Sequence, residues 1–118
     1  MAANTESILG SVKKLLGSDD YFDPDLILHI NTVFSKLQQI GVGPAEGFSI
    51  SDDTTTWSEY TENVAVLNMV KSYMAIQVKL LFDISTASSY LISELNKKSE
   101  ELEWRLNAAV DFKQKTEP

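Results

Sequence analysis

Apolar residues recur at intervals of three and four positions over most of the chain, which is the pattern of amphipathic helices. The pattern predicts four helices, at about residues 5–16, 23–40, 62–82 and 88–110. Asp23 followed by Pro24 marks a helix start, because proline lacks an N–H that the first helical position does not need. Gly17 and Gly41 follow the first two stripes and supply the left-handed residue that ends a helix.

Helix 62–82 is apolar almost all the way round, as expected of a central helix that packs on several sides. Helix 88–110 carries a narrow apolar stripe and a charged opposite face, so one side packs and the other is solvated. The sequence therefore predicts an all-α fold, a small bundle of about four helices in a single domain over residues 1–110. The tail 111–118 has little to bury, and we expect it to be flexible in the free subunit.

The helical pattern disappears between the second and third of these helices. Two β-prone runs, 48–50 and 54–57, flank Ser51-Asp52-Asp53, so a short β-hairpin or an extended loop is expected here. An isolated hairpin is only marginally stable in water. Its large apolar residues, Phe48, Ile50 and Trp57, must therefore pack either on the chain's own helices or on another subunit.

Composition and charge narrow the function. A chain of 118 residues fits one domain, and the absence of cysteine suits a reducing compartment. The net charge is −7, and the excess of negative charge lies in residues 17–63, which contain nine acidic residues and only one basic residue, Lys36. Such a segment repels phosphate, which disfavours conventional nucleic-acid binding. No secretory signal and no run of roughly 20 apolar residues is evident, so we expect no membrane partner.

Candidate chemistry is sparse. His29 is the single histidine, and a lone helical histidine is more often a packing or surface residue than a catalyst. The acids at 19, 20, 23 and 25 lack the spacing of a calcium loop and are better explained by turn solvation and capping. Trp104, with Glu100, Glu101 and Glu103 nearby, is either a partner-binding aromatic or, as we favour, a residue at the edge of the core. We therefore expect no enzyme activity, no metal and no cofactor.

Several strings in order along the chain carry a resemblance to a known family. They are Ile27-Leu-His-Ile-Asn-Thr-Val-Phe-Ser-Lys-Leu37, Gly41-Val-Gly-Pro, Gly47-Phe-Ser-Ile-Ser with Trp57, Val70-Lys-Ser-Tyr73, Lys79-Leu-Leu-Phe-Asp83 and Glu101-Leu-Glu-Trp-Arg-Leu-Asn107. Over about residues 20–110 the chain resembles the small head–tail connector (adaptor, or head-completion) proteins of long-tailed phages and prophages. The family commonly has two prolines where this chain has Ile84-Ser85, which leaves the start of the last helix open.

The resemblance implies a structural virion protein. Subunits of the family form a homo-oligomeric ring of about twelve copies below the portal protein, and this ring is continued by a tail-completion or stopper protein. DNA would pass through the ring without specific binding. The subunit would be present in the host cytoplasm during assembly and then in the virion.

Two groups of residues are candidates for these contacts. For a subunit or partner interface we select Phe48, Ile50, Trp57, Tyr60, Phe112, Lys113 and Lys115. For an acidic lining of the ring we select Asp19, Asp20, Asp52, Asp53, Glu59 and Glu62. The alternative function is a small acidic helical regulator that binds a host protein; it would stay a monomer or dimer, whereas a connector would form large rings.

Overall fold

A computed structural model describes residues 6–17, 22–83 and 88–116, and it is all-helical, as the sequence predicts. The helices in chain order are α1 (Ile8–Leu16), α2 (Asp23–Gln39), α3 (Trp57–Tyr60), α4 (Val64–Asp83) and α5 (Ser89–Thr116). Four of them correspond to the four predicted helices, and α3 is an additional single turn. The described ranges contain no β-strand.

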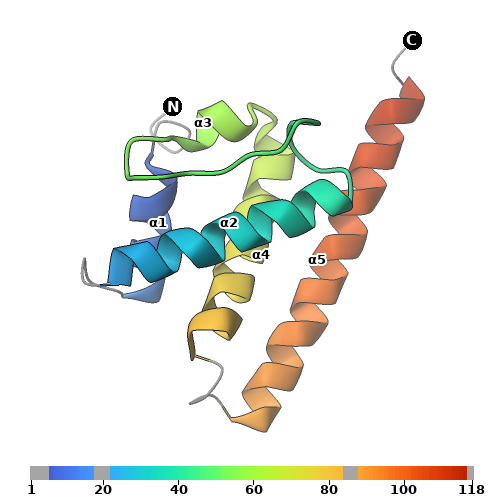
Figure 1. The fold of residues 1–118 in the computed structure, drawn as a ribbon. Coiled ribbons are helices and arrows are strands. Elements are labelled where there is room, and N and C mark those ends of the chain that lie inside the picture. The colour runs from blue at the N-terminus through green and yellow to red at the C-terminus, as the bar shows by residue number, and fades with distance from the viewer. Residues whose placement is uncertain (1–5, 18–21, 84–87, 117–118) are drawn as a thin grey trace.

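The central element is α4, which packs against α1, α2 and α5. In Figure 1, α2 crosses in front of α4, while α1 and α5 lie at opposite edges of the molecule. The segment between α2 and α4, which includes α3, runs back along α2 toward α1. The apolar circumference of α4 in the sequence is thus explained by three helical neighbours.

Local sequence explains how α1 and α2 begin and end. The Ser7 side chain caps α1, and Gly17 ends it in the left-handed conformation at φ 68°. The predicted start of α2 shifts by one position, because Asp23 is already helical and Phe22 occupies the cap. Gly41 adopts φ 88° directly after α2, as expected of the residue that ends a helix.

The last helix is longer than its apolar stripe indicates. The Ser88 hydroxyl accepts a hydrogen bond of 3.1 Å from the backbone N–H of Leu91, which agrees with the predicted start. At its other end α5 continues to Thr116, beyond the predicted end near Val110. The backbone of most of the predicted tail is therefore helical. Its flexibility in the free subunit remains a prediction.

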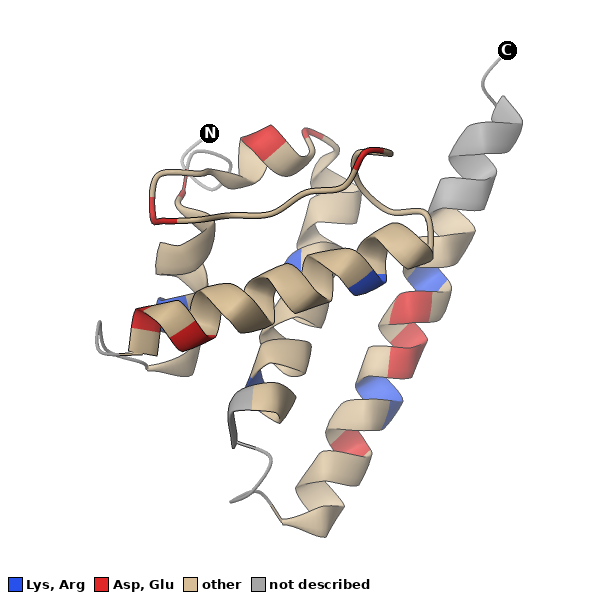
Figure 2. Cartoon of the chain, viewed as in Figure 1, with Lys and Arg blue, Asp and Glu red and all other residues tan. Residues whose placement is uncertain are grey.

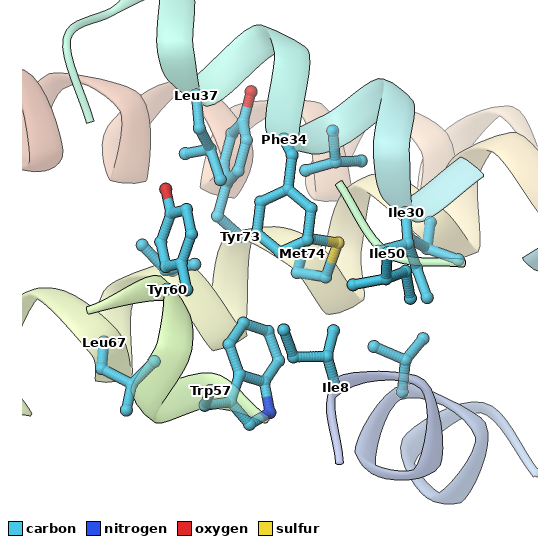
Figure 3. Packing of buried hydrophobic residues seen from close by; sticks show 14 of the residues in the cluster. Ile8, Ile30, Phe34, Leu37, Ile50, Trp57, Tyr60, Leu67, Tyr73 and Met74 are labelled. Atoms are coloured by element: carbon cyan, nitrogen blue, oxygen red, sulfur yellow. The ribbon is translucent and has the colours of Figure 1, made fainter. Parts of the chain in front are cut away.

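One apolar core lies between α1, α2, α3 and α4. Figure 3 shows its large side chains converging, with Phe34 from α2, Trp57 and Tyr60 from α3, and Tyr73 from α4. Leu106, which is fully buried, is the main apolar contribution of α5 to the same cluster. The core is continuous, so the segment between α2 and α4 folds as part of the domain.

The predicted β-hairpin is not present, and the extended alternative is observed. Thr56 forms an isolated antiparallel bridge with Ser7, near the start of the described chain. Hydrogen bonds from Ile8 N–H to Thr55 O (3.0 Å) and from Trp57 N–H to Glu6 O (3.2 Å) flank that bridge. The β-prone run therefore pairs with a distant extended segment and not with its neighbour in sequence.

From the sequence we predict no segment that resembles a membrane span. Judged by length and hydropathy alone, that prediction is wrong, because one segment does. The 18 residues Val64–Leu81 within α4 have a mean hydropathy of 1.3, enough to qualify. In the fold, however, these residues form the central helix, and they include the core residues Leu67, Val70 and Met74. Packing inside the bundle accounts for the 39% of this segment that is buried.

Candidate functional site

The segment between α2 and α4 is fixed to the helices by a side chain that imitates a neighbouring strand. Asn31 of α2 donates from Nδ2 to the carbonyl oxygen of Ile50 at 2.9 Å and accepts from the Ile50 N–H at 2.8 Å. Both backbone groups of Ile50 are thereby satisfied without a β-ladder. Its side chain is buried in the core.

Trp57 is the anchor between this segment and α1. Its side chain is 1% exposed, and its Nε1–H donates to the hydroxyl oxygen of Ser11 at 2.8 Å. The Ser11 hydroxyl in turn donates to the carbonyl oxygen of Ile8 at 3.1 Å. A buried indole N–H requires a partner of this kind, and the sequence separation between Trp57 and Ser11 made the pair unpredictable.

An aromatic cluster closes the other end of the segment. Phe34 of α2 lies against Phe48 and Tyr60, with ring centroids 5.0 and 4.8 Å apart. The Tyr60 ring also covers Gly43, where an added Cβ would lie 2.7 Å from the phenol. Burial raises the pKa of Tyr60, and its hydroxyl has no hydrogen-bond partner among the described residues.

These contacts show where four of the predicted interface residues lie in the fold. Ile50, Trp57 and Tyr60 are core residues of their own subunit, and Phe48 is half-buried at the edge of the core. The segment therefore packs on the chain's own helices, which is the first of the two alternatives considered above. Side chains that are this deeply buried present little surface to a neighbouring molecule.

The predicted acidic residues that the structure describes lie on the surface of the same segment. Asp52, Asp53, Glu59 and Glu62 are all exposed, and residues 37–70 contain no lysine, arginine or histidine. Figure 2 accordingly shows acidic but no basic positions between α2 and α4. We refer to the exposed acidic side chains of this segment, Glu46, Asp52, Asp53, Glu59 and Glu62, as the acidic face. Asp19 and Asp20 lie outside the described residues.

Two acids of the acidic face also have local structural roles. Asp52 accepts hydrogen bonds from the backbone N–H and the hydroxyl of Thr54, and these bonds hold the pKa of Asp52 below its ordinary value. Glu59 accepts from the backbone N–H of Thr56 at 2.9 Å and so forms the capping box of α3. Asp53 and Glu62 form no hydrogen bond or ion pair with the described residues and are exposed, so their charges are available to the solvent.

The longest helix, α5, makes directional polar contacts with α4 in addition to the packing of its apolar stripe. Tyr73 of α4 donates to a carboxylate oxygen of Glu103 at 2.7 Å. Burial, and after it this hydrogen bond, raises the pKa of the Tyr73 phenol. Gln77 of α4 donates to the buried hydroxyl of Ser99 and accepts from Lys36 of α2 at 2.9 Å. These directional bonds fix the rotation of α5 about its axis.

The outer side of α5 carries exposed aromatic rings. Trp104 is 73% exposed and Tyr90 is 74% exposed. We favoured a position at the core edge for Trp104, and that interpretation is wrong. A signal was available in the sequence: Trp104 is two residues from both Leu102 and Leu106, about 200° around the helix from each, and so lies opposite the packed stripe.

The remaining predicted interface residues are Phe112, Lys113 and Lys115. Their backbone belongs to α5, and their side chains lie outside the described part of the structure. Among the residues whose side chains are described, no group of three or more potential metal ligands is found. Two surface features of the described residues are thus the acidic face and the outer side of α5 with its exposed aromatic rings.

Comparison with known proteins identifies the family. Neither the curated proteins nor the solved structures gave a match. A family model described as phage connector protein matches residues 8–113, a range that begins with α1 and ends within α5. This range covers most of the chain and includes every string on which the sequence resemblance rests. The chain belongs to the phage connector protein family and has a structural connector role in the phage.

Proposed function

We propose that the chain is one subunit of a closed ring that joins the portal protein to a tail-completion or stopper protein. The observation that carries the proposal is the family match over residues 8–113. The fold supports it, because a continuous core allows the subunit to fold before it assembles. The exposed aromatics of α5 support it as well, since exposed large apolar side chains on one helix side are typical of protein contact surfaces.

Within this ring, the acidic face lines the DNA passage. A basic channel would bind the phosphates of passing DNA and retard it, whereas an acidic lining repels them. Five exposed acids without a basic residue in the same segment are the charge distribution that such a lining requires. The ring would be assembled in the host cytoplasm and then become part of the virion.

Electron microscopy of the purified chain, alone and with portal-bearing heads, tests the proposal. We expect closed rings of about twelve subunits, at least when the portal is present. A chain that remains a monomer or dimer under both conditions and instead binds a basic host protein would favour the acidic regulator. In that case the acidic face would act as a mimic of nucleic acid.

Charge reversal tests the lining. Asp53→Lys with Glu62→Lys places two basic residues per subunit on the acidic face, and neither acid caps a helix or a turn. We expect rings of normal size and slower release of DNA, with the delay reduced at high salt. Asp25→Lys is the matched control, because Asp25 is an exposed acid at the start of α2. Equal rates of DNA release for the unmodified chain, the double variant and Asp25→Lys would exclude the proposal that the acidic face lines the passage.

The end of α5 remains a candidate for docking to the portal. Phe112 would fill an apolar pocket of the partner, while Lys113 and Lys115 would meet acidic groups, the usual division between anchor and steering charge. Deleting residues 111–118 should leave the melting temperature of the subunit nearly unchanged and reduce its attachment to portal-bearing heads. Normal attachment of the truncated chain would remove the docking role and leave the connector assignment intact.

A further inference from the structure

Trp104 presents an unusually large exposed ring. It projects from the outer side of α5, away from α4, and its side chain is 73% exposed. Glu100 lies one turn before it on the same side and has no ion-pair partner in the described part of the chain. Exposed tryptophans are rare on monomer surfaces and are the residue type most enriched at the centre of protein interfaces. The outer side of α5 therefore offers an aromatic anchor beside an acid.

A groove of about 210 Å³ lies on the opposite edge of the molecule, between α1, α3 and α4. Val12 and the Trp57 ring are among its lining residues, and Leu15, which is 64% exposed, forms part of its wall. An apolar cavity of about 150 Å³ accommodates a benzene ring, so this groove has room for an aromatic side chain.

The groove is lined by two lysines, Lys14 and Lys71, and by one acid, Glu6, so its net charge is positive. Lys14 of α1 is exposed beside it. Lys71 of α4 lies 5.7 Å from the centre of the Trp57 ring and 4.0 Å from a carboxylate oxygen of Glu6. An aromatic side chain that is accompanied by an acid, such as Trp104 with Glu100, matches this rim in charge.

The two surfaces have the placement that a ring requires. A closed ring is built from heterologous contacts, in which one surface of a subunit meets a different surface of the next. The groove is built on α1, and Trp104 is on α5, and these helices lie at opposite edges of the molecule with α4 between them (Figure 1). Trp104 therefore cannot reach the groove of its own subunit.

From the size of the groove, the charge of its rim and this placement, we infer that Trp104 of one subunit inserts into the α1–α4 groove of the next, with Glu100 opposite Lys14. The inference rests on the proposed ring and identifies its subunit contact. The occupant of the groove is thus a second copy of this chain. The contact repeats around the ring, so each subunit contributes one anchor and one groove.

Thiol cross-linking tests this contact directly, because the chain has no cysteine of its own. A lysine and a glutamate that meet through their side-chain ends have backbones too far apart for a disulfide, so the probe is a short bifunctional maleimide. Treating rings of the full-length chain carrying Lys14→Cys and Glu100→Cys, on portal-bearing heads, should give a ladder of covalent dimers, trimers and higher multimers. The matched control pairs Lys14→Cys with Tyr90→Cys, which is another exposed position about 15 Å farther along α5 from Glu100, and should give none.

Two sets of variants measure the same contact without cross-linking. Trp104→Ala should weaken subunit association by about 30-fold or more, as expected of a buried tryptophan anchor, whereas Tyr90→Ala should not. Lys14→Glu and Glu100→Lys should each weaken association, and the double exchange should restore it. Because all four side chains are exposed in the monomer, the melting temperature should change little.

The outcomes separate the inference from the proposed function. Intact rings without a ladder of cross-linked multimers would overturn the inference and leave the ring in place. Trp104→Ala rings of normal size that fail to join another virion protein would show that Trp104 anchors that protein and would also overturn it. If the unmodified chain forms no rings with or without portal-bearing heads, the proposed function is wrong and the contact fails with it.

Discussion

Replacing Trp57 by alanine should destabilise the subunit more than any exposed substitution. The indole is 1% exposed and packs near Phe34, with ring centroids 6.3 Å apart. Truncating a buried tryptophan to alanine removes about 3–5 kcal/mol from the free energy of unfolding. A domain of this length has about 6–18 kcal/mol in total, so the loss is a large fraction. The melting temperature should fall by about 12–20 °C.

The hydrogen bond of the indole can be separated from its packing. Ser11→Ala removes the acceptor of the Trp57 Nε1–H and leaves a buried donor without a partner. That change should reduce the free energy of unfolding by about 1–3 kcal/mol, which is less than the loss of the whole ring. Trp104→Ala is the matched control, because the other tryptophan is exposed and its removal should change the free energy by less than about 0.5 kcal/mol.

Urea and thermal unfolding followed by circular dichroism measure all three variants. Fluorescence gives a second probe, since the chain has two tryptophans and Trp104→Phe leaves Trp57 as the only reporter. Agreement of the two probes would confirm that the segment from α2 to α4 unfolds together with the helices. A loss below about 1 kcal/mol for Trp57→Ala would refute the assignment of this segment to the core.

Three further changes test the segment and the attachment of α5. Tyr60→Phe removes a buried hydroxyl that has no partner, so thermal melts should show equal or higher stability. Asn31→Asp replaces the donor to the Ile50 carbonyl by an oxygen, and urea unfolding should show a loss of about 1–3 kcal/mol, with Asn31→Ala for comparison. Burial raises the pKa of Tyr73, so this phenol ionises at lower pH in the unfolded chain than in the folded one. The free energy of unfolding should therefore be constant below about pH 10 and fall above it. Above this pH a Tyr73→Phe chain should lose less of its free energy of unfolding than the unmodified chain.

The helices were predictable because their signals are local. A period near 3.6 fixes which residues share a face, and glycines such as Gly17 and Gly41 end helices through their own backbone freedom. The fate of the segment between α2 and α4 was not predictable in the same way. Its β-prone runs pair with Glu6 to Ile8 and with Asn31, which are far away in sequence, and a pattern within the segment contains no information about such partners.

The candidate surfaces also differ in how far the sequence alone could predict them. The exposed acids followed from composition, because a segment with five acids and no base cannot bury them in pairs. From the sequence we select Trp57 and Tyr60 for an interface, but both side chains are buried in the core of their own subunit. Trp104 was assigned to packing by residue type, although its position opposite Leu102 and Leu106 places it outside.

The polar contacts beneath α5 bear on where Trp104 points. Leu102 and Leu106 could pack on α4 over a range of helix rotations, because apolar contacts have little directionality. The hydrogen bonds from Tyr73 to Glu103 and from Gln77 to Ser99 are satisfied at one rotation only. A tryptophan that must reach a groove on a separate subunit requires its direction to be set before contact, since each unfixed rotation adds an entropic cost to association. The hydrogen bonds on the inner side of α5 thus set the direction of Trp104, whereas the apolar contacts of Leu102 and Leu106 on the same side stabilise the attachment of the helix.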